Sequence, residues 1–477
     1  MSKVSRNILS LVFSRVLAAA LVFVGYASMF RYLGTYSSGQ YQFVLSYVLL
    51  FSVVVDFGIQ QLVIKKVSEN REEGKKYLGH FFAVEFVLAL GIWIVLSSIA
   101  IIAGYDQLVR NGIFVAGFGM FLNALTIPHK SILSAHEDMH HIAIINFFDS
   151  VINVAVIFSA IFLGKSVVFL SLVQVFNGLM HVLAYEYLIR RYVPRPELFN
   201  FLKSLDFSLI KKMMTAALPF GMLVGFSVVY NKIDIIILTH FRGYAETGLY
   251  TAAYKFVDLL AFVPAVVSSS LYPFISARLA SEDKETISSS LQKYTRMMLA
   301  LAIPLMVGGV ILAKKLIVVV GGSDFFGGYV ALQILVLASG ILFIYAAVNS
   351  VMVNQLTKIA VKVTFINIFL NVLGNIIFIP IYGLKAAAVM TVVSELTQAS
   401  LYFYFVRKKI VSFKFFRYIW QPLFSALIMG GILWPLRHSS LGITLPIGFI
   451  VYFIVLSASG FVKKEDFLFI SNLRSIR

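Results

Sequence analysis

Fourteen apolar stretches, separated by short polar loops, follow one another along the whole chain. Each is long enough for a helix to cross a bilayer, which takes about 20 apolar residues. The pattern predicts an all-α integral membrane protein with 14 transmembrane helices. Lys314 and Lys315 interrupt the ninth stretch, so 313–320 is a candidate interfacial segment. The expected spans are 8–30, 41–64, 78–103, 112–134, 141–163, 167–189, 214–239, 249–274, 294–312, 329–353, 359–381, 384–406, 416–436 and 441–462.

Lysine and arginine are concentrated in every second loop. With the N-terminus inside, 29 of the 40 Lys and Arg residues fall in the cytoplasmic loops and tails, and 8 fall in the outer loops. Positive charge marks the cytoplasmic side of a membrane protein. We therefore expect both termini in the cytoplasm and a location in the cytoplasmic (inner or plasma) membrane. The first apolar run has no small-residue cleavage site and is expected to be a span, not a signal peptide.

Two short segments resemble each other at a constant offset of 209 residues. Each follows the first expected span of one half of the chain, and six spans separate them. Such a repeat is parallel, with a pseudo-two-fold axis along the membrane normal. Two unrelated glycine turns are the alternative. The matched pairs are Gly34 with Gly243, Gly39 with Gly248, and Tyr41 with Tyr250.

The longest polar connection divides the chain near its middle and carries Pro194 and Pro196. We expect an N-terminal six-helix lobe at 1–192, a cytoplasmic linker at 193–213 and a C-terminal six-helix lobe at 214–410. Residues 411–477 then form an extra helix pair with a cytoplasmic tail.

Composition narrows the class of protein further. Hydrophobic residues make up 60% of the chain and the mean hydropathy is +0.89, which excludes a soluble globular domain. The net charge of +18 does not indicate a nucleic-acid partner, because the basic residues lie in loops between apolar spans, where they face anionic headgroups. The absence of cysteine excludes disulfides and thiolate sites. Walker A and nucleophile-elbow motifs are also absent, so we expect no enzyme.

Three cations lie deep within expected spans, away from the span ends: Arg15, Lys232 and Lys255. An ionisable group at bilayer depth costs roughly 2.5–3.5 kcal/mol, so such residues face a bundle interior or water. One interpretation is a cationic lining for an anionic ligand. The alternatives are that Arg15 reaches the headgroups or pairs with Asp56, and that Lys255 pairs with Asp258 three residues later.

Other polar residues inside the spans form stripes on helical faces. Lys232 and Asp234 are two apart and point differently, so at least one of them needs a partner on another helix. Hydrogen bonding between helices and the lining of a polar conduit are the two interpretations of the stripes. The stripes are Asn146, Asp149 and Asn153 in the fifth span, and Asn367, Asn371 and Asn375 in the eleventh.

Histidines gather beside the loop between the fourth and fifth spans, at His129, His136, His140 and His141, together with Glu137 and Asp138. Their spacing does not match a set of metal ligands. We expect a solvated loop and no metal.

Two segments carry a family resemblance. The first runs from Arg31-Tyr-Leu-Gly34 through Gly39-Gln-Tyr41 to Val55-Asp56-Phe-Gly58 and Lys65-Lys66. The second runs from Asn367 to Ile379-Pro380-Ile-Tyr-Gly383-Leu-Lys-Ala-Ala-Ala388. The chain resembles, over essentially its whole length, the oligosaccharide (O-antigen-type) flippase family of the multidrug/oligosaccharidyl-lipid/polysaccharide exporter superfamily. Lys385 departs from the pattern, which more commonly has a small residue there, at the outer vestibule.

The resemblance implies two six-helix lobes around a central cavity and export of lipid-linked oligosaccharide by alternating access. It implies a cationic cavity that holds a polyprenyl-pyrophosphate headgroup, a role that fits Arg15, Lys232 and Lys255. Membrane lipids and other glycan-assembly proteins are the further partners. No cofactor is expected, and coupling to Na⁺ or H⁺ through Asp56 or Asp149 is an open alternative.

Three rival functions predict different features. A cation-coupled exporter of small drugs from the same superfamily would have an acidic cavity and twelve spans. A membrane glycan polymerase or ligase usually carries a large outer loop with catalytic Arg or His, and no outer loop here is long enough. A non-transporting scaffold would show no flux.

Overall fold

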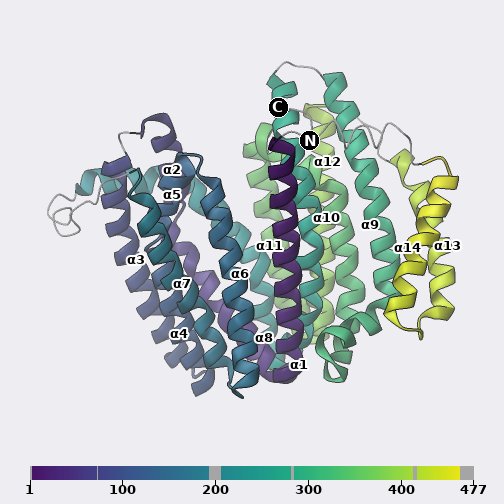
Figure 1. Ribbon diagram of the computed structural model, residues 1–477, viewed down its shortest axis with the longest axis horizontal. Coiled ribbons are helices and arrows are strands. Elements are labelled where there is room, and N and C mark those ends of the chain that lie inside the picture. The colour runs from purple at the N-terminus through teal and green to yellow at the C-terminus, as the bar shows by residue number, and fades with distance from the viewer. Residues whose placement is uncertain (1–2, 72–73, 193–205, 281–283, 412–415, 462–477) are drawn as a thin grey trace. The chain divides into compact units, whose positions relative to one another are not determined.

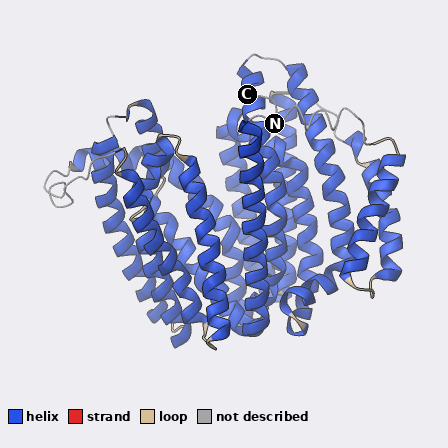
Figure 2. Ribbon diagram, in the orientation of Figure 1, coloured by secondary structure: helices blue, strands red, loops and turns tan. Residues whose placement is uncertain are grey.

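Helices and connecting loops make up the computed structural model, and no strand occurs in the part of the chain that it describes (Figure 2). The backbone is described for residues 3–71, 74–192, 206–280, 284–411 and 416–461. The side chains of these residues are described except for 3–17, 74–77, 219, 223, 266–280, 284 and 416. An all-helical chain suits a bilayer, because a helix satisfies its own backbone hydrogen bonds where water is absent.

Fourteen α-helices and two short 3₁₀ segments lie within these described ranges (Figure 1). The helices are α1 (Lys3–Asp56), α2 (Ile59–Glu69), α3 (Gly74–Ile102), α4 (Gln107–Ala124), α5 (Ile127–Ala135), α6 (Met139–Phe162), α7 (Val167–Ile189), α8 (Phe207–Ala280), α9 (Lys284–Gly321), α10 (Tyr329–Gln355), α11 (Thr357–Tyr382), α12 (Leu384–Lys409), α13 (Trp420–Leu436) and α14 (Leu441–Ala458). The 3₁₀ segments are η3 (Ser323–Gly328) and η4 (Phe416–Tyr418).

Ten helical segments of the described chain are long and apolar enough to cross a bilayer, which confirms a multi-pass, all-α membrane protein. Ten is fewer than the fourteen expected spans for two reasons. Two of the ten segments, Ala18–Asp56 and Phe220–Ala265, are 39 and 46 residues long, and each covers parts of two expected spans. In addition, α12 is not among the ten, and α13 has only 17 residues.

The expected breaks after the first and seventh spans are single-residue kinks inside α1 and α8. Gly34 has φ 68° and ψ −177°, and Gly243 has φ 79° and ψ 179°. A positive φ costs little conformational free energy only in glycine, because in other residues the Cβ would crowd the following carbonyl. The two glycines that the 209-residue offset matches therefore share one unusual backbone conformation. We call residues 3–33 and 35–56 the first and second limbs of α1, and 207–242 and 244–280 those of α8.

The fourth expected span, 112–134, is divided into α4 and α5 at Leu125 and Thr126. Pro128 lies in the first turn of α5. Proline has no backbone N–H to donate, so it fits the start of a helix and disrupts the middle of one. Its position explains the division.

The chain forms two compact units. The first, here called the N-terminal unit, is residues 18–248; the second, the C-terminal unit, is residues 1–17 with 249–477. The unit boundaries thus fall inside α1 and α8. The sequence-based division at 192, 213 and 410 stays a prediction, and most of its linker, 193–205, lies outside the described residues.

Small residues allow close helix contacts in the N-terminal unit. A Cβ on Gly119 of α4 would lie 2.5 Å from Cβ of Gln174 on α7, and a Cβ on Gly178 of α7 would lie 2.7 Å from Cβ of Leu122. Lipid tails are as apolar as leucine, so helices associate in membranes through such close packing. At the other end of the unit, buried apolar residues of α2, α3, α5, α7 and α8 form one cluster.

In the C-terminal unit, α9, α10, α11 and α12 share a buried cluster that includes Tyr294, Phe343 and Tyr402. The pair α13–α14 packs on α9 through a second cluster around Met429 and Tyr452 (Figure 1). The last two helices are thus attached to α9 as a separate pair.

The helix α9 continues through Gly321, so 313–320 is helical, and its location at the membrane interface stays a prediction. Nζ of Lys315 donates a hydrogen bond to the carbonyl oxygen of Ser439. Nζ of Lys314 lies 4.9 Å from the ring centroid of Tyr329, a cation–π contact. Partners from other segments accommodate both lysines, so the helix need not end before them.

Candidate functional site

The three cations predicted to bind an anionic headgroup belong to the long kinked helices. Arg15 lies in the first limb of α1, and its side chain is outside the described part of the structure. Lys232 lies in the first limb of α8 and Lys255 in the second, and both side chains are partly buried. Lys232 belongs to the N-terminal unit and Lys255 to the C-terminal unit. Their convergence on one cavity stays a prediction.

Lys255 has a partner on its own helix. Its Nζ lies 3.2 Å from Oδ2 of Asp258, so the pair that the three-residue spacing allows is formed. The side chain of Asp258 is 45% exposed. The side chain of Lys255 is only 18% exposed.

Asp234, two residues from Lys232, is buried in α8. Its Oδ1 accepts a hydrogen bond of 2.8 Å from the backbone N–H of Ile235. Lys232 and Asp234 cannot face one another along a helix at this spacing, so the two residues have different surroundings, as the sequence indicated.

Asp56 ends α1 and caps α2. Its Oδ1 accepts a hydrogen bond of 3.1 Å from the backbone N–H of Gln60. Phe57 and Gly58 join the two helices with φ of 43° and 78°. A Cβ on Gly58 would lie 2.7 Å from the carbonyl carbon of Phe220, so the turn needs glycine for both conformation and space. This geometry gives Asp56 a capping role at the start of α2.

Asp149 is the charged member of the stripe on α6. Its Oδ1 lies 2.8 Å from Nε2 of His181 on α7. Asn146 is exposed and Asn153 is partly buried. This contact links α6 to α7. His181 was missed from the sequence, although a histidine within an apolar span is itself a signal of a polar partner.

The three asparagines of α11 form a hydrogen-bonded ladder with α12. Nδ2 of Asn367 donates to Oε1 of Gln398 over 2.9 Å, and Nδ2 of Asn371 donates to Oγ of Ser394 over 3.0 Å. Nδ2 of Asn375 donates to Oδ1 of Asn371, also over 3.0 Å. All three asparagines are buried. The ladder supports hydrogen bonding between helices as their role.

A second buried contact continues this polar layer toward α10. The hydroxyl of Tyr345 donates a hydrogen bond of 2.6 Å to Oε2 of Glu395 on α12, and the side chains of both residues are buried. The ring of Tyr345 also meets Tyr402 edge to face, with centroids 6.1 Å apart. The C-terminal unit therefore holds an extended polar layer between α10, α11 and α12. The sequence analysis did not identify three members of this layer: Tyr345, Ser394 and Gln398. A single polar residue in an apolar span gives no periodic pattern by which it could be recognised.

The two glycine kinks bring equivalent residues together within the N-terminal unit. A Cβ on Gly39 would lie 2.6 Å from the carbonyl carbon of Tyr244, and one on Gly248 would lie 2.9 Å from the carbonyl carbon of Thr35. The 209-residue offset relates Gly39 to Gly248 and Thr35 to Tyr244. The second contact therefore repeats the first with the two segments exchanged. Self-complementary contact of this kind is the mark of a two-fold relation. The ring of Tyr244 also packs on Tyr36, with centroids 5.5 Å apart.

The histidine-rich loop between α5 and α6 forms a hydrogen-bonded cluster with the end of α7. Asp138 bonds with Nδ1 of His141 and accepts a 3.0 Å hydrogen bond from the hydroxyl of Tyr192. Burial raises the pKa of Asp138, but these hydrogen bonds and the charges of His141 and Arg191 lower the pKa by more, to below its usual value. Among the described residues, no three His, Cys, Asp or Glu side chains are grouped as a metal site requires.

Comparison with known sequences gives a consistent picture. The profile of a family described as "Polysaccharide biosynthesis protein" matches residues 4–279. The chain is 22% identical over 446 residues to the "Probable low-salt glycan biosynthesis flippase Agl15" of Haloferax volcanii, covering 91% of this chain and 90% of the relative. It is 23% identical over 351 residues to the "Succinoglycan biosynthesis transport protein ExoT" of Rhizobium meliloti, covering 71% of this chain and 67% of the relative.

Solved structures share the fold. The chain superposes on the lipid II flippase MurJ, in an inward closed conformation, with a TM-score of 0.79 and 16% identity over 94% of this chain and 98% of that chain. An inward-facing multidrug resistance MATE family transporter gives a TM-score of 0.63 and 13% identity over 82% of this chain and 94% of that chain. The helices are therefore arranged in a MurJ- and MATE-like fold.

Proposed function

Because the chain belongs to the polysaccharide biosynthesis protein family, a family of membrane transporters and not of enzymes, we propose that it flips polyprenyl-pyrophosphate-linked oligosaccharide from the cytoplasmic to the outer leaflet. Such a flippase would supply cell-surface polysaccharide biosynthesis. The observation that carries the proposal is the likeness to a glycan-biosynthesis flippase over 91% of the chain. The lipid-flippase fold over 94% of the chain supports it.

We infer fourteen crossings of the cytoplasmic (inner or plasma) membrane, with both termini in the cytoplasm. A helix of 39 or 46 residues is about 58–69 Å long, roughly twice the 30 Å of bilayer hydrocarbon, so the kinked segments Ala18–Asp56 and Phe220–Ala265 each cross twice. Each kink follows the first span of a six-helix lobe, 1–192 or 214–410, and we infer that the two lobes form a parallel repeat. The contacts of Gly39 with Tyr244 and of Gly248 with Thr35, which the 209-residue offset relates, support this repeat.

The mechanism we infer is alternating access. The headgroup enters between the lobes from the cytoplasmic leaflet while the polyprenyl tail stays in lipid. Arg15, Lys232 and Lys255 pair with its pyrophosphate, and Lys255 exchanges Asp258 for a phosphate oxygen. The lobes then rock about the crossing of the kinked helices. An inside-negative potential favours export by about 2.3 kcal/mol per net negative charge per 100 mV.

Of the two carboxylates considered for coupling, Asp149 is the better candidate. Asp56 already accepts a hydrogen bond from the backbone of α2, whereas Asp149 faces the imidazole of His181, a side chain that binds protons and not Na⁺. H⁺ is therefore the coupling ion that the contact of Asp149 favours over Na⁺. The buried asparagine ladder of α11 then holds two helices together and does not carry the ion.

The test of the cationic site is flipping by purified protein in proteoliposomes. The double variant Arg15→Gln/Lys232→Gln should slow flipping of a fluorescent polyprenyl-pyrophosphate oligosaccharide by more than about tenfold, because hydrogen bonds to charged groups contribute about 1.5–3 kcal/mol each. Lys362→Gln, an exposed lysine of α11, is the matched control and should flip at the wild-type rate. Full activity of the double variant at equal expression would refute the role of these cations.

A cation-coupled exporter of small drugs is the second candidate, because the fold also matches a MATE transporter. That function requires an acidic cavity, whereas the candidate residues within the spans here are of mixed charge: three cations together with Asp56, Asp149, Asp234 and Asp258. Transport of a small cationic drug, with no flipping of lipid-linked glycan, would favour it.

A further inference from the structure

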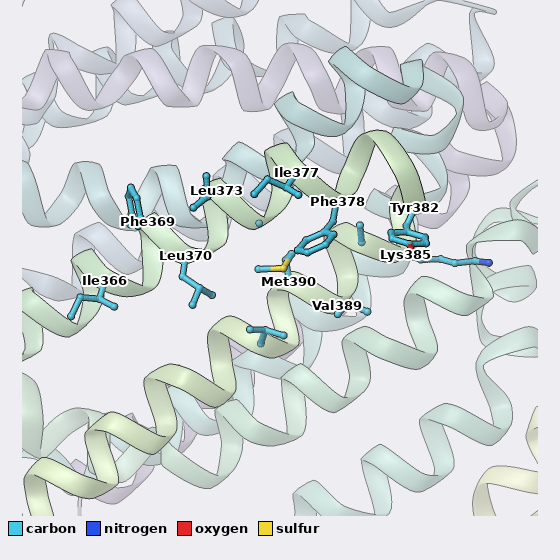
Figure 3. A pocket seen from close by; sticks show the side chains of 13 residues that line it. Ile366, Phe369, Leu370, Leu373, Ile377, Phe378, Tyr382, Lys385, Val389 and Met390 are labelled. Atoms are coloured by element: carbon cyan, nitrogen blue, oxygen red, sulfur yellow. The ribbon is translucent and has the colours of Figure 1, made fainter.

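An apolar pocket of about 780 Å³ lies between α11 and α12, within the C-terminal unit (Figure 3). Cavities of this size are typical of ligand sites. Figure 3 shows Ile366 at one end and Tyr382 with Lys385 at the other. All lining residues apart from Tyr382 and Lys385 are apolar. Nearly all of the pocket surface is therefore apolar, and its one charged residue, Lys385, lies at one end.

The pocket is longer than one leaflet is deep. From Ile366 to Tyr382 the helix advances 16 residues, which is about 24 Å at 1.5 Å per residue. Half of the bilayer hydrocarbon is about 15 Å. A lipid chain that fills this pocket therefore passes the midplane, as a long polyprenyl chain does and an acyl chain of one leaflet does not.

The floor of the pocket is adaptable. A Cβ on Gly374 would lie 2.6 Å from Sδ of Met390, so the missing side chain at Gly374 makes room for the thioether. Methionine is flexible and polarizable, which lets it follow an irregular ligand. An unsaturated, branched chain is a ligand of that kind.

The charged end suits a phosphate. Lys385 is exposed, and no described residue pairs with it. It lies in the first turn of α12, just after Gly383, which joins α11 to α12. From the distribution of basic residues we infer that this end of the two helices lies on the outer side. A cation at the mouth of an apolar groove complements a lipid with a phosphate head.

We propose that this pocket binds the polyprenyl phosphate carrier in the outer leaflet, with its tail along α11 and its phosphate against Lys385. The inference rests on the proposed function and adds a second lipid site to it, on the release side. A lipid held there would lie beside the transporter on the side where the glycan is released.

The experiment is photolabelling of the full-length protein in liposomes by a polyprenyl phosphate with a photoreactive tail, followed by mapping of the labelled peptide. Label should fall on 366–393, and competition by polyprenyl phosphate should be at least about tenfold stronger than by polyprenol, phosphatidylglycerol or inorganic phosphate. Equal competition by phosphatidylglycerol would mean ordinary lipid contact, and equal competition by inorganic phosphate would mean a phosphate site without a tail site. Either result would overturn the proposal.

Two matched pairs of variants sharpen the test. Lys385→Gln should weaken labelling by about threefold to tenfold while Lys385→Arg retains it, since a charged hydrogen bond is lost only in the first. Leu373→Trp should block the pocket, whereas Ile381→Trp, on the same helix and 63% exposed but outside the pocket, should label as wild type. Equal labelling within either pair would overturn the proposal.

Flipping by the wild-type protein is measured in the same liposomes. If the wild type flips lipid-linked glycan but label falls outside 366–393, the pocket assignment fails and the flippase proposal stands. If the wild type does not flip but label falls within 366–393, the flippase proposal fails while the pocket remains a polyprenyl phosphate site.

Discussion

Gly39→Ala is expected to destabilise the N-terminal unit at the crossing of α1 and α8. The added Cβ would lie 2.6 Å from the carbonyl carbon of Tyr244 and 3.0 Å from the backbone nitrogen of Gly248. Carbon atoms in contact are normally about 3.5–4.0 Å apart. The opposing atoms belong to backbone, so no side chain can turn away and the helices must separate.

The size of the effect follows from two opposing contributions. Overpacking costs about 1–3 kcal/mol, and rigid backbone on both sides places this crossing in the upper half of that range. Alanine in a helix regains up to about 1 kcal/mol over glycine. We therefore expect a net loss of about 1–2 kcal/mol in the free energy of unfolding. Gly248→Ala should lose a similar amount, because its Cβ would lie 2.9 Å from the carbonyl carbon of Thr35.

The assay is reversible unfolding in mixed micelles, with Gly91→Ala as the control. A Cβ on Gly91, in α3, meets nothing within 4 Å, so alanine there should be neutral or stabilising. The double variant Gly39→Ala/Gly248→Ala should cost less than the two single losses added together, because the first substitution already separates the helices. Equal stability of Gly39→Ala and Gly91→Ala would refute the close crossing.

Three further predictions concern other parts of the fold. Gly243→Ala should lower the free energy of unfolding by about 1–2 kcal/mol, measured by thermal unfolding in detergent. The φ of 79° is the cause, since the added Cβ would meet nothing within 4 Å. An unchanged unfolding temperature would count against the kink. Tyr345→Phe removes the 2.6 Å hydrogen bond to buried Glu395 and should cost about 1–3 kcal/mol in the same assay, a prediction that wild-type stability would contradict. The lowered pKa of Asp138 stabilises the folded loop above pH about 4, and this contribution is lost as the pH falls through the pKa of the folded state. Hydrogen exchange of 136–141 should accelerate on acidification in the wild type and show less pH dependence in Asp138→Asn; the same pH dependence in both proteins would exclude this role.

Much of the fold could be predicted from the sequence, because hydrophobic length and loop charge are strong signals in a membrane protein. The glycine offset was also informative, since Gly34 and Gly243 share a backbone conformation that excludes most other residues. Contacts that depend on tertiary partners could not be predicted. The ammonium group of Lys314 in α9 lies 4.9 Å from the ring centroid of Tyr329, and spacing alone does not reveal this contact.

The candidate site was less predictable. Lys255 and Asp258 pair as their spacing allows, since the partner is on the same helix. Asp149 pairs with His181 on another helix, and Asn371 with Ser394, which no local pattern can specify. Local pairs can therefore be read from the sequence, whereas partners on neighbouring helices depend on how the helices pack.

Transport by the wild-type protein is the most direct test of the central claim. Proteoliposomes would be loaded in parallel with a fluorescent polyprenyl-pyrophosphate oligosaccharide and with a small cationic drug, under an imposed inside-negative potential. We expect the glycan lipid to reach the opposite leaflet and the drug to remain where it was. Movement of the drug without movement of the glycan lipid would contradict the account.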